Sequence, residues 1–507
     1  MIFNTDKQTL TDLNILGKPG ADSVYTVFSD TSTQGGAAIL ENMFRYPLAD
    51  MAAINSRSSK IRFFQSVNAG FPFRSGLFDV IEVYLAMQDD RTRLAPEDNT
   101  LARKLNHLIA ADNNYKAISD GIRSLIEMLH MLQGFFIHMA TISDDNPYQA
   151  DMEEMINILR YPALEPVLKE QAGNKLSYAK VAEYDQLLRF RFRNELSRIL
   201  SLIYHLDVYV TVARVATERK FVFPVALDAG THQMRLEGVY HPLVKNAVAN
   251  SIHITPENNV IFLTGANMAG KSTFMKSLGI AMFLAHMGFP VAAAKMEFAV
   301  REGIYTTINL PDDLSSGSSH FYTEVLRIKT IARELAKGKS LFLIFDELFR
   351  GTNVKDAYEG TVAVTAAFAE REHCIFVIST HITEAGEALK AQCNNIRFLF
   401  LPTKMENNRP VYTYQLAEGI TTDRHGMVII ENEGILDIIS QLRQTVLSKG
   451  PNRLHDWYGK PLITVSAAFH RPVHNSRSST GSGGERFRRH QGRSYPAAGY
   501  ARHQRDV

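Results

Sequence analysis

A glycine-rich segment between an apolar run and a helical stretch constrains the fold more than any other feature of this sequence. Residues 265–272 read G-A-N-M-A-G-K-S and fit the pattern G-x-x-x-x-G-K-S/T. The apolar run 259–264 comes directly before them, and a helical stretch begins near Ser272. Glycines at these positions let the backbone fold around a polyphosphate with its N–H groups pointing inward. The sequence therefore predicts a strand, a phosphate-binding turn and a helix in succession.

Two more apolar runs, 340–345 and 374–379, look like buried strands that are each followed by a turn and a helical stretch. Strands of this kind pair in parallel, and their functional loops lie at the carboxyl ends. The change to this pattern begins near Phe221. We predict an α/β domain over residues 236–445, with the three strand ends at one edge of its sheet.

Before this domain the pattern is mostly helical, from about residue 35 to 235. Apolar residues recur at intervals of three and four over 180–216, which predicts one long helix. An earlier helix is expected over 115–142, antiparallel to it. The sequence thus predicts a multidomain protein, in which a mostly α-helical domain over residues 1–235 precedes the α/β domain.

Four arginines interleave the apolar residues of the long predicted helix: Arg189, Arg191, Arg193 and Arg198. Side chains of this kind can contact nucleic-acid phosphates. A charged face of a long helix can equally be solvated and nothing more. Both interpretations stay open at this point.

The composition narrows the class of protein. The chain has 507 residues, more than one hydrophobic core usually organises. Lys and Arg number 55 against 53 Asp and Glu, so any contact with nucleic acid must come from local patches. Only two cysteines occur, and no apolar run approaches the roughly 18 residues of a membrane span. We expect a cytoplasmic protein with no disulfide framework and no membrane association.

The C-terminal extension, residues 446–507, changes composition again. Beyond residue 470 it consists largely of Arg, Ser, Gly and His without apolar periodicity, so we expect no packed core there. Disorder beyond residue 470 is one interpretation, and a basic tail that holds nucleic acid is the other.

Residues at the ends of the three predicted strands carry the chemistry. Lys271 is placed to reach the β and γ phosphates of a nucleotide, and the Ser272 hydroxyl to bind Mg²⁺. Asp346 is expected to hold the Mg²⁺ shell, and Glu347 to orient or deprotonate the attacking water. His381 follows the third strand, where it can sense the γ phosphate or simply be exposed. An Asp-Glu pair after a strand can be merely a charged turn, and the glycine-rich segment is what favours the catalytic interpretation.

Together these segments resemble the MutS family of DNA mismatch repair ATPases, which belongs to the ABC-type P-loop ATPases. Residues 264–273 look like the family's T-G-P-N-M-G-G-K-S-T, from which they depart at Ala266 and Ala269. Residues 346–352 are similar to its D-E-I-G-R-G-T, and 379–381 to its A-T-H. Neither alanine removes a phosphate-binding group, so the resemblance implies a working ATPase of that fold.

The resemblance extends the candidate site beyond the strand ends. Residues 238–242 are similar to the family's G-x-x-H-P segment near the adenine, and 314–321 to a loop that in the family reaches across a dimer to the partner's nucleotide. It implies ATP and Mg²⁺ as cofactors, Glu347 and His381 as catalytic residues, and Ser272 and Asp346 as metal ligands. The nucleotide-binding residues that it implies are Gly265, Asn267, Met268, Ala269, Gly270, Lys271, Ser272, Thr273, Tyr240, His241 and Ser319.

The resemblance covers residues 26–439 and implies that the helical domain is a core with a lever arm. The family's N-terminal mismatch-reading motif is missing, so we expect a trimmed relative. Such a relative is expected to be a homodimer, joined through its ATPase domains, that couples ATP binding and hydrolysis to engagement of mismatched or branched DNA in repair or recombination. The alternative is a nucleotide-switched ATPase that binds a protein partner and does not read DNA.

Overall fold

The computed structural model describes residues 3–18, 20–94, 110–142, 145–308, 310, 320–406, 409–421 and 430–440. Met1–Ile435 form one compact unit, which contains both the helical and the α/β part, and Leu436–Val507 form a second. The predicted domain boundaries near residues 235 and 445 stay predictions. The expectation for the chain beyond residue 470 lies outside the described residues, as does Ser319.

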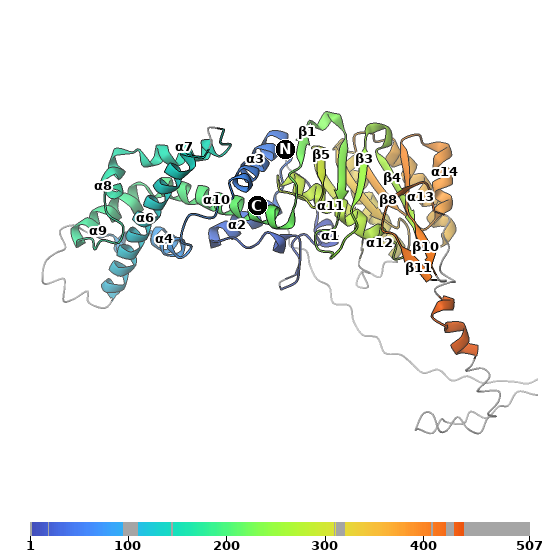
Figure 1. Ribbon diagram of the computed structural model, residues 1–507, viewed down its shortest axis with the longest axis horizontal. Coiled ribbons are helices and arrows are strands. Elements are labelled where there is room, and N and C mark those ends of the chain that lie inside the picture. The colour runs from blue at the N-terminus through green and yellow to red at the C-terminus, as the bar shows by residue number, and fades with distance from the viewer. Residues whose placement is uncertain are drawn as a thin grey trace, which may run out of the picture. The chain divides into compact units, whose positions relative to one another are not determined.

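The first part of the described chain is helical (Figure 1). Its longest helices are α6 (Ala110–Ala140) and α10 (Arg193–Arg219). The shorter helices are α1 (Lys7–Asp12), α2 (Gln34–Arg45), α3 (Met51–Ser66), α4 (Gly76–Ala86), α7 (Gln149–Leu159), α8 (Glu165–Leu168) and α9 (Tyr178–Asp185). Polar side chains cap several of them, and Thr33, for example, accepts a hydrogen bond from the Gly36 amide at the start of α2.

The helix α10 packs mainly on α2 and α3, whereas α6 packs mainly on α4 and also on α9. The prediction that the helix over 115–142 pairs with the long helix is therefore wrong for most of the length of α10. Among the described residues, α10 is the one helix long and apolar enough to cross a membrane, and 83% of its apolar stretch is buried inside the protein. Its apolar character is explained by the two helices that cover it.

The single helix predicted over 180–216 is interrupted. A π-helical turn (Gln186–Arg191) separates α9 from α10, and at this turn the Arg189 side chain is buried. Its guanidinium pairs with Asp185 at 2.6 Å and donates to the Met87 carbonyl at 2.9 Å. Burying such a charge requires partners on both sides, and the widened turn gives the side chain access to them.

The four arginines of this segment do not form one charged face. Arg189 is buried, Arg193 donates to the Leu85 carbonyl at 3.0 Å, and Arg198 pairs with Glu154 at 2.6 Å. Arg191 is exposed, and its guanidinium lies 5.6 Å from the centre of the Phe192 ring. Of the two interpretations left open by the sequence, neither a phosphate contact nor a solvated face applies to Arg189, because its side chain is enclosed in the fold.

The second part of the described chain contains a six-stranded sheet in the order β12-β9-β4-β8-β7-β6. The pairs β9–β4, β4–β8, β8–β7 and β7–β6 are parallel, and only β12 runs antiparallel to its neighbour. The strands are β4 (Val260–Gly265), β6 (Gly303–Thr307), β7 (Leu341–Asp346), β8 (Ile375–Ser379), β9 (Ile396–Leu401) and β12 (Ala417–Glu418). The three apolar runs are confirmed as buried parallel strands.

Helices cover both faces of this sheet (Figure 1). Along β4, Ile261 and Leu263 belong to the core around α11 (Lys271–His286), whereas Val260 and Phe262 belong to a second core. The second core includes residues of α12 (His320–Leu335), α13 (Val354–Ala369) and α14 (Thr383–Gln392). A strand buried on both faces needs no polar alternation, which explains the continuous apolar runs.

A smaller sheet of order β1-β5-β2-β3 lies on the other side of α11, which contacts β2 as well as β4, β6 and β7. Its strands are β1 (Val225–Leu227), β2 (Met234–Val239), β3 (Asn250–Ile254) and β5 (Lys295–Ala299), and a hairpin of β10 (Thr403–Glu406) and β11 (Arg409–Tyr412) completes the described strands. Because α11 lies between two sheets, it is buried almost all round.

The N-terminal residues close the free edge of the large sheet at β6. The Asn4 carbonyl accepts from the Ile304 amide at 2.9 Å, and the Thr9 hydroxyl accepts from the Thr306 amide at 3.0 Å. The buried Asp12 carboxylate accepts from the Thr306 hydroxyl at 2.7 Å and from the Ile308 amide at 2.9 Å. This edge contact was not predicted from the sequence.

Candidate functional site

The turn between β4 and α11 has the backbone that the glycine-rich pattern predicts. Gly265 has φ 149° and Gly270 has φ 99°, values that residues with a side chain rarely adopt. A Cβ on Gly270 would also lie 3.0 Å from Cδ1 of Tyr414. Met268 has φ 66°, and its side chain is 78% exposed at the tip of the turn. The first turn of α11 therefore presents its free N–H groups toward the loop.

Lys271 is folded into this turn. Its Nζ donates to the Gly265 carbonyl at 2.9 Å and to the Ala266 carbonyl at 3.3 Å, and the side chain is buried. Burial lowers the pKa of Lys271, and the charges of Glu347 and Asp346 oppose that shift. The ammonium is thus held where a polyphosphate in the turn would meet it.

A cavity of about 550 Å³ opens beside the turn. The predicted residues that line it are His241, Asn267, Met268, Gly270, Lys271, Ser272, Thr273 and Glu347. Gly265 and Ala269 belong to the turn itself, and Ala269 is buried beneath it. Tyr240 is not among the residues that line the cavity, and its hydroxyl donates to the Arg219 carbonyl at 3.4 Å.

The ends of β7 and β8 bring four polar side chains together. Asp346 and Ser379 are register partners, and the Ser379 hydroxyl donates to Asp346 Oδ1. The Glu347 amide donates to the Ser379 carbonyl at 3.1 Å. Glu347 has a φ of 60°, so the chain turns sharply at this residue. Nε2 of His381 donates to Glu347 Oε1 at 2.6 Å. The two predicted catalytic residues are therefore in direct contact.

The electrostatics of Glu347 follow from this contact. The hydrogen bond from His381 lowers the pKa of Glu347, burial opposes the shift, and the charges of His381, Lys271 and Arg350 add to the lowering. The carboxylate is consequently ionised at neutral pH. An ionised carboxylate accepts hydrogen bonds and is suited to holding a water molecule.

The donor groups of the site fit a Mg²⁺–nucleotide. A buried ammonium and a helix N-terminus favour a polyphosphate, and the Ser272 hydroxyl with the Asp346 carboxylate offers Mg²⁺ the oxygen ligands that it prefers. Groups of three or more His, Cys, Asp or Glu that could hold a metal by themselves are absent from the described part of the chain. Magnesium usually keeps nucleotide oxygens and water as its other ligands, so two protein groups suffice.

Several residues of the cavity wall, among them Asn250, were not singled out in the sequence. The Asn250 amide donates to the Tyr414 carbonyl at 2.9 Å, and its oxygen accepts from the Leu416 amide at 2.8 Å. Asn250 thereby holds Tyr414 against Gly270, on the cavity wall. Only the fold brings β3 to the segment after β11, and no local pattern could have indicated this pair.

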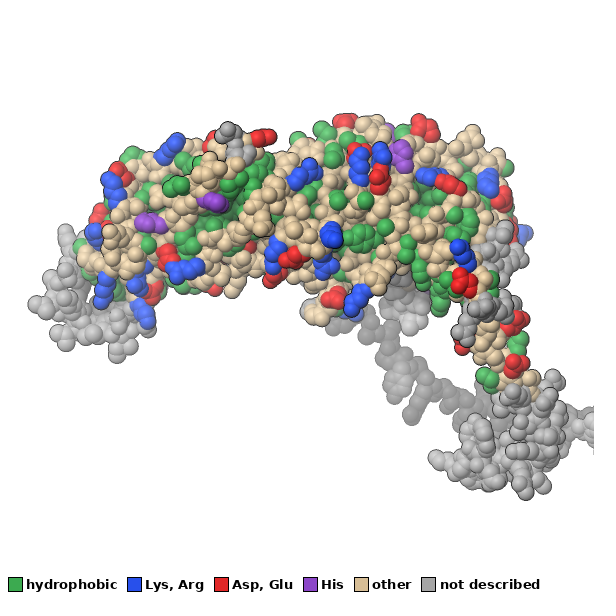
Figure 2. All heavy atoms as spheres, in the orientation of Figure 1, with side chains coloured by type: hydrophobic (Ala, Val, Ile, Leu, Met, Phe, Trp, Pro, Cys, Tyr) green, Lys and Arg blue, Asp and Glu red, His purple; other side chains and the backbone are tan. Residues whose placement is uncertain are grey.

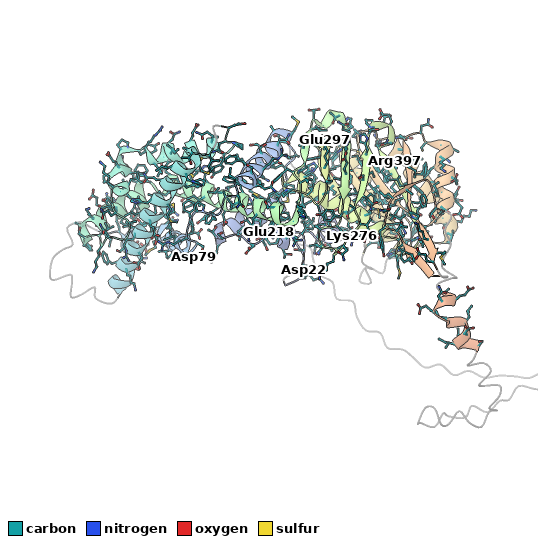
Figure 3. All side chains as sticks on the ribbon, in the orientation of Figure 1. Asp22, Asp79, Glu218, Lys276, Glu297 and Arg397 are labelled. Atoms are coloured by element: carbon teal, nitrogen blue, oxygen red, sulfur yellow. The ribbon has the colours of Figure 1, made fainter. Side chains whose placement is uncertain are left out.

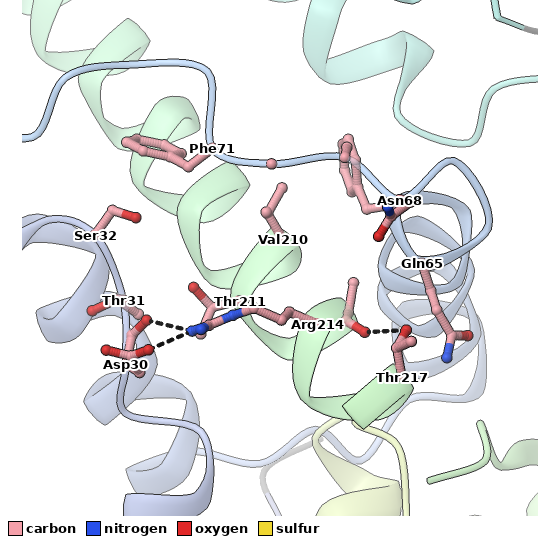
Figure 4. A pocket seen from close by; sticks show the side chains of 14 residues that line it. Asp30, Thr31, Ser32, Gln65, Asn68, Phe71, Val210, Thr211, Arg214 and Thr217 are labelled. Atoms are coloured by element: carbon pink, nitrogen blue, oxygen red, sulfur yellow. Dashed lines mark hydrogen bonds and ion pairs between the residues drawn. The ribbon is translucent and has the colours of Figure 1, made fainter. Parts of the chain in front are cut away.

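Two other hollows on the described surface lack this chemistry. A cavity of about 360 Å³ lies between residues 64–71, α10 and the segment 30–32, and its Arg214 is paired with Asp30 at 2.6 Å (Figure 4). An open groove over β2, β3 and β5 includes Glu297 and Arg397, which Figure 3 places on the two sheets. Arg397 is itself paired with Glu418.

Comparison with known proteins relates this part of the chain to the MutS family. Residues 261–449 match the family model of MutS domain V, which includes the turn, both strand-end carboxylates and His381. The chain is a partial relative of the MutS family. It is 27% identical over 383 residues to the DNA mismatch repair protein MutS of Shouchella clausii, covering 72% of this chain and 42% of that protein. It is 28% identical over 331 residues to the MutS protein of Anaplasma phagocytophilum, covering 62% and 39%. The chain thus spans about two fifths of the length of the MutS relatives that it matches.

Proposed function

We propose that this chain is a Mg²⁺-dependent ATPase of the MutS type. One observation carries the proposal: Lys271, in the glycine-rich turn, and Glu347, hydrogen-bonded by His381, line the same cavity. A phosphate-binding cation and a water-orienting carboxylate in one cavity are what phosphoanhydride hydrolysis requires. Asp346, the neighbour of Glu347, supplies a metal ligand beside them.

Each residue has a separate role in the proposal. Lys271 and the amides of the turn bind the phosphates, while Ser272 and Asp346 hold Mg²⁺, which neutralises phosphate charge when bound. Glu347 orients the attacking water, and His381 keeps the Glu347 carboxylate in place and ionised. The lowered pKa makes Glu347 a weak base, so orientation is its main contribution and proton acceptance the lesser one.

We also propose that ATP use is coupled to DNA engagement in mismatch repair or a related process. The relatives are named as DNA mismatch repair proteins, and this supports the proposal. The packing of α10 gives a route for coupling: the carbonyl of Arg219, its last residue, accepts from Tyr240, next to the cavity residue His241. A homodimer through the ATPase domains, with Ser319 at the partner's nucleotide, and a cytoplasmic location also belong to this proposal.

A nucleotide-switched ATPase that binds a protein partner is the second candidate. The engagement of Arg189 and Arg193 within the fold favours it, because these side chains are less available to phosphates. On the face shown in Figure 2, Lys and Arg side chains also lie interspersed with Asp and Glu. A mixed surface of this kind gives weaker attraction to a polyanion than a basic patch.

The two candidates are separated by one binding experiment. The purified protein is titrated with a fluorescent duplex, a mismatched duplex and a four-way junction, with and without ATP, over a salt series. Nucleotide-dependent binding that weakens steeply with salt supports the DNA proposal, because phosphate contacts release counterions. Preference for the junction or the mismatch identifies the DNA class. ATP hydrolysis without binding to any of the three favours the protein-partner candidate.

A further inference from the structure

Arg301 is a fully buried cation at the end of the large sheet opposite the candidate site. It lies between β5 and β6, close to the first residues of β6, β7 and β8, whereas Glu347 and His381 follow the last residues of β7 and β8. Its exposed fraction is 0%. Nη1 donates to Ser340 Oγ at 2.9 Å and to the His373 carbonyl at 2.7 Å. The proposed ATPase activity makes no use of this residue.

The other two nitrogens of this guanidinium are unsatisfied. Nε and Nη2 of Arg301 are buried and have no hydrogen-bond partner among the residues that the structure describes. Arg189 is the instructive comparison, because that buried guanidinium is paired with Asp185 at 2.6 Å. A buried cation without a counter-charge is costly, and native proteins compensate such groups.

The surroundings of Arg301 offer further donors. Buried ring nitrogens of His232 (Nδ1) and His373 (Nε2) also have no partner among the described residues. Arg301 and His373 are close enough to His232 that their charges help to lower its pKa, after desolvation as the main cause. The nearby Glu302 carboxylate is engaged by the Ser340 amide at 2.8 Å.

His286 contacts the backbone of Arg301 and supplies no counter-charge. Its Nε2 accepts from the Arg301 amide at 2.9 Å, and its Nδ1 donates to the Met282 carbonyl at 2.8 Å. Burial holds the pKa of His286 at about 4, so the ring is neutral. Both ring nitrogens are used, so His286 does not compensate the charge of Arg301.

We propose that Arg301, His232 and His373 form a binding site for a small monovalent anion, with chloride as the ordinary occupant. The guanidinium Nε–H and Nη2–H and the two imidazole N–H groups all donate, and a halide accepts several hydrogen bonds at once. The burial of these four nitrogens excludes a nucleotide or an extended ligand. The site is structural: it would neutralise the amino end of the sheet whose carboxyl end binds phosphate.

The first test measures the thermal unfolding midpoint of the full chain in sodium chloride and in sodium gluconate at equal ionic strength. An anion that binds only the folded state stabilises it by mass action, so the midpoint should be higher in chloride, by ~2 °C or more at a hundredfold excess over the dissociation constant. The variants Arg301→Met and His232→Ala should lose this difference. Arg91→Gln is the control, because Arg91 is 89% exposed and pairs with Asp89, and it should keep the difference.

A second measurement does not depend on whether Arg301→Met folds. Crystals of the unmodified protein grown in sodium bromide should show an anomalous peak within hydrogen-bond distance of Arg301 Nε and Nη2. Equal midpoints in the two salts would overturn the proposal, and so would bromide crystals with only water beside Arg301. Neither result bears on ATP hydrolysis, so this inference and the proposed function stand or fall separately.

Discussion

Nε2 of His381 lies 2.6 Å from Oε1 of Glu347, although the two residues follow different strands and are 34 positions apart in the sequence. The contact makes the two side chains one unit. His381 restricts the rotamer of the Glu347 carboxylate and favours the charged form of that carboxylate. A substitution at His381 should therefore change both the position and the pKa of Glu347.

Replacing Glu347 with Gln should leave ATP binding intact and slow hydrolysis by roughly 10²-fold or more, because the amide cannot hold and polarise water as a carboxylate does. Steady-state phosphate release and equilibrium nucleotide binding measure the two effects. Glu359→Gln is a matched control, since Glu359 lies on the exposed face of α13. Unchanged turnover in Glu347→Gln would show that another residue orients the attacking water.

Replacing His381 with Ala should reduce turnover by roughly 10- to 100-fold, because Glu347 loses its positioning contact. The pKa of Glu347 should also rise toward its ordinary value. Since the carboxylate acts in its ionised form, activity should then be lost at a higher pH as the solution is acidified. The pH dependence of kcat in both proteins tests this, and an identical acidic limb would show that His381 does not control the Glu347 charge.

Lys271→Ala should weaken ATP binding by roughly 10- to 100-fold, as expected for loss of a charge-assisted hydrogen bond. Lys355→Ala is the control, because Lys355 is 84% exposed on α13. Fluorescent nucleotide titration gives both dissociation constants. Tight ATP binding by the Lys271 variant would contradict the phosphate-binding assignment of the turn.

The parts of the fold that rest on local pattern could be predicted from the sequence. The apolar runs that became β4, β7 and β8 are continuous because helices cover both sheet faces, and parallel pairing then places Asp346, Glu347 and His381 together. Composition and periodicity could not show that Arg189 turns inward, because a π-helical turn breaks the spacing on which helix faces are predicted.

Contacts between residues far apart in the sequence also could not be predicted from the sequence. Tyr240 sits next to His241 in the sequence, yet its hydroxyl is taken by the end of α10, which the segment itself gives no reason to expect. The pairing of Asp12 with Thr306 joins residues 294 positions apart. Side chains of this kind acquire their role only from the tertiary structure.

Asp12→Ala should destabilise the protein by about 2–4 kcal/mol, because the Ile308 amide and the Thr306 hydroxyl would be left buried without their acceptor. Urea unfolding measures the free energy of unfolding. Asp22→Ala serves as the control, since Asp22 is exposed (Figure 3). Equal stability of the two variants would mean that the edge contact contributes little.

The contact between Asp12 and β6 also sets an order of events during synthesis. Asp12 accepts a hydrogen bond from the Ile308 amide, which is 296 residues further along the chain. At a translation rate of about 5–20 residues per second, the first helix waits roughly 15 to 60 s for its partner to leave the ribosome. During that interval the edge residues of α1 are open to chaperones and proteases, and the nucleotide-binding sheet is completed only after most of the chain has been made.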